Sequence, residues 1–365
     1  MFKLFSSPYL PEAADPHAFD SDPPARDPGP LGVLLVNLGT PDEPTPASIR
    51  RYLGEFLSDP RVIEIPQWLW QVILRLFILT RRPKALAPRY EEIWLKQGSP
   101  LLVWSQAQAA GVQSRLRAGG LQLRVELGMR YGNPSIASAC ESLRAQGCQR
   151  ILMAPMYPQY AASTTATAVD RLAAHAGRLR DQPELRFIKR YHDDPGYIDA
   201  LGRRVQGYWA QHGKPQRLLL SFHGLPRRTV ELGDPYHRDC METASLLKKY
   251  LGPDGDLVHV SFQSRFGAER WLEPYTEQTL RAWAREGVQA VDVICPGFLA
   301  DCLETLEEIQ MQCRDAFLGE GGRQFRYIPC LNDDPVWADH FAAIIERHLA
   351  GWTPVRPPLP ADAGL

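Results

Sequence analysis

The sequence has almost no excess of charge of either sign. Its 365 residues include 41 lysines and arginines and 42 aspartates and glutamates, which gives a formal net charge of -1. A surface that binds nucleic acid needs a basic excess to neutralise phosphates. We therefore expect no nucleic acid among the partners.

Cysteine is scarce and irregularly spaced. The seven cysteines fall between residues 140 and 330, and no two of them have C-x-x-C spacing. Structural zinc sites and redox dithiols commonly use that spacing, so neither is indicated. The first residues also lack the uninterrupted apolar run of a secretory signal. We therefore expect reduced thiols and a cytoplasmic location.

Common catalytic motifs are missing as well. The sequence contains no G-x-G-x-x-G, no Walker A loop, no G-x-S-x-G and no H-E-x-x-H. These are the usual marks of dinucleotide binding, P-loop phosphate chemistry, serine hydrolysis and zinc peptidases. Any chemistry must come from another arrangement of side chains.

Both ends of the sequence read as tails. Residues 1–30 contain seven prolines and little apolar periodicity, and residues 351–365 are similar in kind. Such segments cannot bury enough apolar surface to offset the entropy of ordering. We expect a disordered N-terminal extension over 1–30 and a flexible tail over 351–365. The length between them is sufficient for two ordinary domains.

One apolar segment, Ile65–Pro83, could be mistaken for a membrane span. Gln71 and Arg75 interrupt it, and its apolar part is shorter than the roughly 20 residues that a spanning helix requires. Tryptophans at one end and basic residues at the other suit a helix that lies in a lipid surface, but a buried core helix fits the same pattern. A third interpretation is an apolar lip over a large flat ligand. Residues 66–80 are thus the candidates for peripheral membrane contact.

Strand-like apolar runs alternate with amphipathic stretches, which predicts parallel sheets flanked by helices. Three matches suggest that the pattern occurs twice: LLVNLGTP with LLSFHGLP, ILMAPMYP with DVICPGFL, and RYHDDPGYIDA with CLNDDPVWADH. Their offsets are 185, 141 and 140 residues, so the first copy carries about 44 extra residues that include the apolar segment. We predict two similar Rossmann-like α/β halves with an active-site cleft between them. Chance similarity among strand ends is the alternative explanation.

In such folds the ligand lies at the carboxyl ends of the strands. His223 follows the predicted strand RLLLSF, and Leu38 has the matching place in the first half. After the strand AVDVIC, a predicted helix carries Glu304 and Glu308 on one face, followed on that stripe by Gln312. A site of nitrogen and carboxylate ligands suits a borderline ion such as Fe(II), and histidine exchanges protons near neutral pH. The plainer interpretation is a structural histidine beside carboxylates that favour the helix dipole.

Several longer motifs resemble those of the ferrochelatase family. They are NLGTP at 37–41, YPQYAASTT at 157–165, SFHGLP at 221–226, GDPYHRDC at 233–240, QSRFGAERWLEPYT at 263–276 and CPGFLADCLETLEE at 295–308. The resemblance covers about residues 31–350. It implies an enzyme that inserts ferrous iron into protoporphyrin IX to form protoheme, the last step of haem biosynthesis, with release of two protons. It also implies a fold of two Rossmann-like halves.

The resemblance further implies roles for individual residues. The histidine and glutamate that the family requires fall on His223 and Glu304, which we expect to be catalytic and, together with Glu308, to bind the metal. No cofactor beyond the substrate iron is implied, because the C-terminal tail lacks the cysteines of the iron–sulfur cluster that some members carry. The residues we expect to bind the porphyrin are Leu38, Tyr160 and Trp271.

These observations predict a first half over residues 31–190 with the lip insertion and a second half over 191–335 with the catalytic residues. A helix over 336–350 is expected to pack back on the first half. Gln312 stands where the family has a third acid, which puts a relay of three carboxylates in question. A related chelatase for coproporphyrin or another metal, and a non-catalytic carrier of haem or porphyrin, are the alternatives. The sequence leaves the oligomeric state open.

Overall fold

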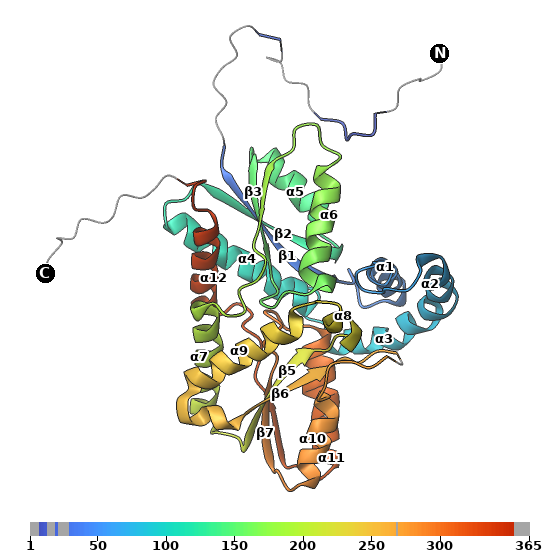
Figure 1. Ribbon diagram of the computed structural model, residues 1–365, viewed down its shortest axis with the longest axis vertical. Helices are drawn as coiled ribbons and strands as arrows, with labels where there is room; N and C mark the ends of the chain where they lie inside the picture. The colour runs from blue at the N-terminus through green and yellow to red at the C-terminus, as the bar shows by residue number, and fades with distance from the viewer. Residues whose placement is uncertain (1–6, 13–18, 21–28, 268, 354–365) are drawn as a thin grey trace, which may run out of the picture.

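The computed structural model describes residues 7–12, 19–20, 29–267 and 269–353. Two parallel four-stranded sheets, both flanked by helices, lie one above the other in Figure 1. The strand order is β2-β1-β3-β4 in the first sheet and β6-β5-β7-β8 in the second. Because the two orders are the same, the predicted fold of two similar α/β halves is confirmed.

The first sheet consists of β1 (Leu31–Thr40), β2 (Leu123–Gly132), β3 (Arg150–Pro155) and β4 (Glu184–Phe187). Between these strands lie α1 (Pro46–Phe56), α2 (Gln67–Ile73), the π-helix η1 (Leu74–Ile78), α3 (Leu79–Ile93), α4 (Pro100–Ala118), α5 (Ile136–Ala145), the π-helix η2 (Ala162–Ala166) and α6 (Thr167–Ala176).

The second sheet consists of β5 (Arg217–His223), β6 (Val258–Gln263), β7 (Ala290–Ile294) and β8 (Gln324–Tyr327). The other elements are α7 (Pro195–His212), α8 (Arg227–Glu231), α9 (Tyr236–Leu251), the 3-10 helix η3 (Gly252–Leu257), α10 (Thr276–Arg285), the π-helix η4 (Glu304–Cys313), α11 (Arg314–Gly319) and α12 (Pro335–His348).

The repeated Asp-Pro motif starts the helix that follows the last strand of each sheet. Asp194 accepts a hydrogen bond from the backbone N–H of Gly196 at the start of α7, and Asp334 accepts one from that of Val336 at the start of α12. A proline follows each aspartate at the first helical position, where its missing N–H costs nothing. The third sequence match is therefore a shared helix N-cap.

The sheet register aligns the strand ends of the two halves. Asn37 pairs with Met129 in the first sheet, and Phe222 pairs with Phe262 in the second. The N–H of Met129 and that of Phe262 each donate to the carbonyl of a proline beyond the strand, at 2.6 and 2.8 Å. The next positions on β1 and β5, which are Leu38 and His223, are therefore equivalent.

The register also corrects the second sequence match by one residue. Leu35 pairs with Ala154 in the first half, and Leu220 pairs with Ile294 in the second. Strands β3 and β7 are thus offset by 140 residues rather than 141, so Pro155 corresponds to Cys295. The alignment of Pro155 with Pro296 was wrong by one residue, because strand pairing, and not residue type, decides which positions are equivalent.

The extra residues of the first half form α1, α2, η1 and α3. In the second half only α8 stands between β5 and α9, the counterpart of α4. The insertion projects beside the junction of the two halves (Figure 1). It has an apolar cluster of its own, with Ile49, Tyr52, Trp70 and Leu74 packed together with Tyr131 of β2. No helix among the described residues is both long enough and apolar enough to cross a bilayer.

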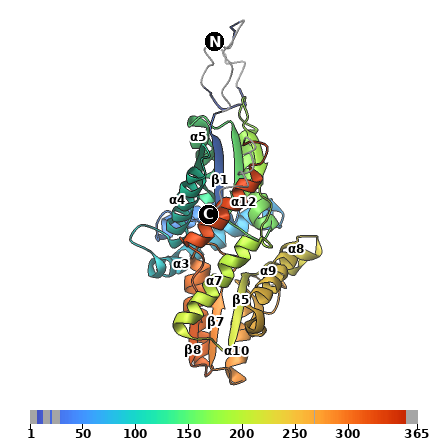
Figure 2. The ribbon, with the colours of Figure 1, turned by 90° about the vertical axis from the view of Figure 1, so that its left-hand side faces the viewer.

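Contacts across the junction tie the halves together. The amide of Gln108 on α4 donates to the Leu299 carbonyl beyond β7 at 2.7 Å, and the amide of Gln159 beyond β3 donates to the Thr243 hydroxyl of α9 at 3.0 Å. Helix α12 lies beside the first sheet and α7 beside the second (Figure 2), and Asp339 of α12 pairs with Arg115 of α4. The C-terminal helix therefore packs against α4. The division of the chain at residue 190 stays a prediction.

The predicted tails fall mainly outside the described residues. Residues 7–12 are described, and they lie along the first half. The Leu10 N–H donates to the Arg178 carbonyl at 2.8 Å, and Glu12 pairs with Arg144 of α5. This short part of the N-terminal segment is thus bound to the surface by a backbone hydrogen bond and an ion pair.

Asp59 is a buried carboxylate, only 6% exposed, that joins three parts of the first half. It accepts hydrogen bonds from the Tyr131 hydroxyl at 2.9 Å and from the Thr167 hydroxyl, and it pairs with Arg130. Burial raises the pKa of the Asp59 carboxyl, but these hydrogen bonds, one from the Arg61 N–H and the charge of Arg130 outweigh burial and leave the pKa below its usual value.

Asp59→Asn should lower the free energy of unfolding by about 2 kcal/mol at pH 7, because Arg130 then lacks its counter-ion. Since the folded-state pKa is lowered, the stabilisation is present above the unfolded-state pKa of about 3.9 and is lost as the pH falls through the folded value. Urea unfolding at pH 7 and at about pH 3 measures both effects. A difference between parent and variant that is as large at the acidic pH would contradict this account.

Candidate active site

His223 ends β5 and is half-buried. Its Nδ1 lies 2.7 Å from the carbonyl oxygen of Gly224. A carbonyl only accepts hydrogen bonds, so Nδ1 carries the proton in the neutral ring. The Nε2 atom is then left with a lone pair, which can take up a proton or bind a metal.

Two aromatic side chains lie near His223. The ring centroids of Trp271 and of Phe298 are each 6.5 Å from that of the imidazole. Gly224 permits this approach, because a Cβ at that position would lie 2.7 Å from the Gln263 carbonyl oxygen and 3.1 Å from the Trp271 ring. The Trp271 indole N–H is buried and has no hydrogen-bond partner within the described part of the chain. His223 thus stands beside an apolar surface.

The two acidic residues lie on the π-helix η4, not on the α-helix that the sequence predicted. This helix starts at Glu304 and is ten residues long. Its hydrogen bonds run from i to i+5, which widens each turn, and π-helical turns are frequent at functional sites. The amide of Gln312 contacts Glu307, five residues earlier, at 2.6 Å. The Gln312 amide is therefore bonded to Glu307.

Glu308 is held by the loop after β6. The backbone N–H of Ser264 donates to its Oε1 at 2.7 Å, and the Ser264 hydroxyl donates to its Oε2. Burial raises the pKa of the Glu308 carboxyl above its usual value, the Ser264 hydroxyl and His223 lower it, and the charge of Glu304 raises it. The Glu308 carboxyl is therefore close enough to both His223 and Glu304 to be influenced by them electrostatically.

The remaining predicted residues come from the first half. Leu38 packs on the apolar cluster of the insertion, as does Leu303, the residue before Glu304. This shared cluster connects Leu38 to the start of η4. Tyr160 follows β3, where its N–H donates to Asp239 at 3.3 Å and its ring lies 5.1 Å from the Lys189 ammonium. Tyr160 is thus anchored to α9.

Sequence reasoning missed three residues at this site. Phe298 follows β7 and lies beside His223. Gln263 is the last residue of β6 and Ser264 is the next residue, and both contact the acidic helix η4. The rule that ligands lie at the carboxyl ends of parallel strands could have found all three.

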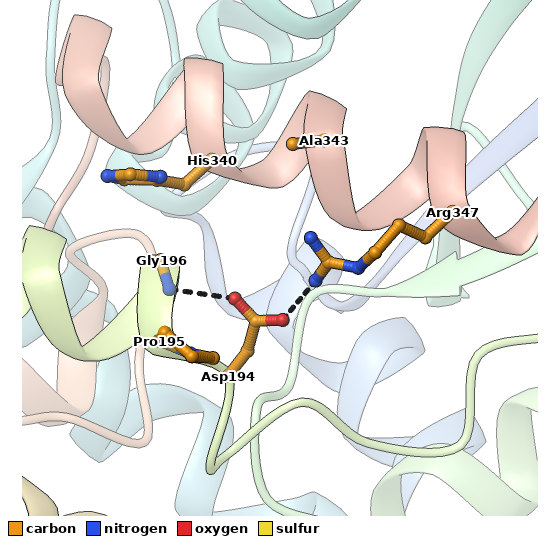
Figure 3. A pocket seen from close by; sticks show the side chains of 6 residues that line it. All are labelled: Asp194, Pro195, Gly196, His340, Ala343 and Arg347. Atoms are coloured by element: carbon orange, nitrogen blue, oxygen red, sulfur yellow. Dashed lines mark hydrogen bonds and ion pairs between the residues drawn. The ribbon is translucent and has the colours of Figure 1, made fainter. Parts of the chain in front are cut away.

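A separate surface hollow of about 480 Å³ lies between the start of α7 and α12 (Figure 3). Its polar side chains already have partners: Asp194 pairs with Arg347, and His340 Nε2 lies 2.9 Å from the Asp199 carboxylate. None of the predicted site residues lines it, so we do not assign the chemistry to this hollow. The residues around it are Asp194, Pro195, Gly196, His340, Ala343 and Arg347.

Within the described residues, one group of three metal-ligating side chains has its donor atoms within 4.8 Å of one another: His192, Asp193 and Glu242. His192 Nε2 already forms a hydrogen bond with Glu242 at 3.0 Å, and both carboxylates are exposed. The predicted ligands His223, Glu304 and Glu308 do not form so compact a group.

Comparisons with known proteins agree with the fold and with the motifs. The family model described as Ferrochelatase matches residues 30–349. The ferrochelatase of Bordetella pertussis is 62% identical over 353 residues, which is 96% of this chain and 98% of that protein. The ferrochelatase of Azoarcus sp. (strain BH72) is 55% identical over 331 residues, 91% of each chain.

Among solved structures, SirB from Bacillus subtilis with Fe3+ matches with a TM-score of 0.54 at 14% identity. The match covers 88% of this chain and 96% of that chain. At this level of identity the likeness shows a shared two-domain fold and nothing more.

Proposed function

This chain belongs to the ferrochelatase family and catalyses the insertion of iron into porphyrin in haem biosynthesis, and we propose that it does so on protoporphyrin IX through His223, Glu304 and Glu308. The product is protoheme, and the reaction forms metal–nitrogen bonds, which makes the enzyme a lyase. The observation that carries the assignment is the fixed tautomer of His223, whose Nδ1 donates to the Gly224 carbonyl.

Metallation exchanges two pyrrole protons for one divalent ion. In a flat porphyrin the nitrogen lone pairs lie in the ring plane and point at one another, so the ring must bend before they face the iron. A close apolar surface can supply the binding energy for this distortion. Trp271 and Phe298 beside His223 offer such a surface in the second half, and Leu38 offers one in the first.

His223 acts as the proton acceptor in this proposal. Its Nε2 is unprotonated in the neutral ring, because Nδ1–H is committed to the Gly224 carbonyl. The same lone pair can bind the iron before it receives a proton from the macrocycle, so one atom can serve both roles in turn. The backbone carbonyl then stabilises the imidazolium by keeping its hydrogen bond to Nδ1.

Glu304 and Glu308 deliver the iron substrate and remove protons. A carboxylate–imidazole set without thiolates suits Fe(II). In this proposal the iron passes from Glu308 to Glu304 and His223. Burial raises the pKa of the Glu308 carboxyl, and a raised pKa makes a carboxylate a better proton acceptor.

The lip insertion has one buried and one exposed face. The interpretation as a core helix fits the buried face, and the interpretation as a helix in a lipid surface fits the exposed face. Trp70, Leu74 and Leu79 are buried in the cluster beside Leu38. Trp68, Leu76 and Phe77 are 77%, 62% and 56% exposed. The exposed apolar side chains of the lip are Ile65, Trp68, Leu69, Val72, Leu76 and Phe77.

We propose that this exposed face makes peripheral contact with a membrane while the enzyme otherwise lies in the cytoplasm. Arg75, Arg81 and Lys84 are exposed on the same segment and would favour an anionic lipid surface. Porphyrin and haem are apolar and partition into lipid, so a lip at the membrane shortens their path to His223.

His223→Ala should abolish iron insertion while porphyrin binding survives, because the aromatic surface remains and the acceptor atom is lost. The measurement is an anaerobic assay with protoporphyrin IX and ferrous iron, following the loss of free-porphyrin fluorescence.

Glu304→Gln should lower kcat in the same assay by about a hundredfold or more, since a neutral amide neither balances the iron charge nor accepts a proton.

His340→Ala, which changes a histidine at the separate hollow, is the matched control and should keep parental turnover. Turnover by His223→Ala at the parental rate would refute the assignment of His223. A parent enzyme that is inactive on protoporphyrin but active on coproporphyrin would replace the proposed substrate.

The double variant Trp68→Ser, Phe77→Ser should bind lipid vesicles about tenfold more weakly, because it removes two large apolar side chains from the exposed face. Co-sedimentation with vesicles of neutral and of anionic lipid measures this, and anionic vesicles should bind the parent better. Phe187→Ser, at an exposed position on β4, is the control. Equal sedimentation of the parent and the double variant would remove the membrane role of the lip.

A further inference from the structure

The loop that follows β6 binds one of the two acidic site residues of η4. Ser264 engages both oxygens of the Glu308 carboxylate, Oε1 through its backbone N–H at 2.7 Å and Oε2 through its hydroxyl. We propose that Ser264 is a positioning residue, which fixes the direction of the Glu308 carboxylate and thereby sets the efficiency of iron delivery. This inference rests on the proposed function of Glu308.

The backbone at Ser264 is arranged for this contact. Its φ of 65° lies in the left-handed region, and among the described non-glycine residues only Asn332 shares this feature. Side chains other than glycine rarely adopt this conformation, so its presence indicates that the surrounding contacts hold it. The conformation turns the N–H and the hydroxyl of one residue toward the same carboxylate.

The preceding residue holds the other acidic position. The Gln263 amide donates to the backbone carbonyl of Glu304 at 2.7 Å, and its carbonyl oxygen accepts from the Ser221 hydroxyl at 2.7 Å. The backbone carbonyl of Gln263 accepts from the Gly224 N–H at 2.8 Å. Two consecutive residues thus connect the end of β5 to both acids of η4.

Helix α3 of the insertion contacts the same loop and the acidic helix. The guanidinium of Arg82 on α3 lies 4.2 Å from the centroid of the Phe266 ring, a cation–π contact. Arg89, also on α3, pairs with Glu307 of η4 at 3.5 Å. The loop and the acidic helix therefore each contact the insertion of the first half.

A carboxylate held in this way suits the transfer of a metal ion. Each carboxylate oxygen has about two lone pairs, so one hydrogen bond per oxygen leaves one lone pair free to bind iron. With both oxygens engaged the group cannot rotate, and its free lone pairs keep a constant direction. Loss of the hydroxyl would allow rotation about the remaining N–H contact.

Ser264→Gly removes only the hydroxyl, because glycine keeps the N–H donor and adopts the left-handed conformation readily. We expect kcat/KM for ferrous iron to fall about tenfold, as is typical for the loss of one hydrogen bond to a charged group, and KM for protoporphyrin to stay within about twofold. Ser142→Ala is the matched control, since it deletes a hydroxyl bonded to the carboxylate of Glu126 on the first sheet. That variant should behave as the parent.

Ser264→Gly should have little further effect in a Glu308→Ala background, because the partner of the hydroxyl is gone. An unchanged kcat/KM for iron in Ser264→Gly would overturn the proposal. So would an equal loss in both backgrounds, or a matching rise in KM for protoporphyrin. The proposed function fails separately, by full turnover in His223→Ala, and the two failures are therefore distinguishable.

Discussion

Neighbouring parallel strands must be joined by a crossover connection, usually a helix on the face of the sheet, and their carboxyl ends therefore lie at one edge. In this chain the ends of the two sheets meet at the junction of the halves. Leu38 is near the end of β1, Tyr160 follows β3, His223 ends β5 and Phe298 follows β7. Hydrogen bonds such as that from Gln108 to the Leu299 carbonyl hold the two edges together. The positions of the candidate site residues follow from this meeting of strand ends.

Much of this arrangement could be read from the sequence. Continuous apolar runs identified the strands, and the strand-end rule led to His223 and to the acidic helix. The alignment of the second match failed by one residue, because letters do not carry sheet register. The lip could not be assigned to one environment, since its residues serve a buried and an exposed face together.

Two features lay beyond sequence patterns for physical reasons. A stripe of acids at four-residue spacing looks the same on an α-helix and on a π-helix, so the wider turn of η4 was not visible. The contribution of Ser264 depends on a backbone N–H and on a left-handed φ, and neither is encoded in its side-chain type. Tertiary contacts from the loop, not local propensity, hold Glu308 in place.

The shared register has a consequence for how such a site could arise. Leu38 corresponds to His223 and, at the offset of 140 residues, Thr164 on η2 corresponds to Glu304 on η4. A half-length chain that formed a homodimer would carry the same residue at both equivalent positions, two histidines or two leucines. Gene duplication and fusion remove that identity. One copy can then evolve reactive groups while the other keeps the shape of an apolar wall.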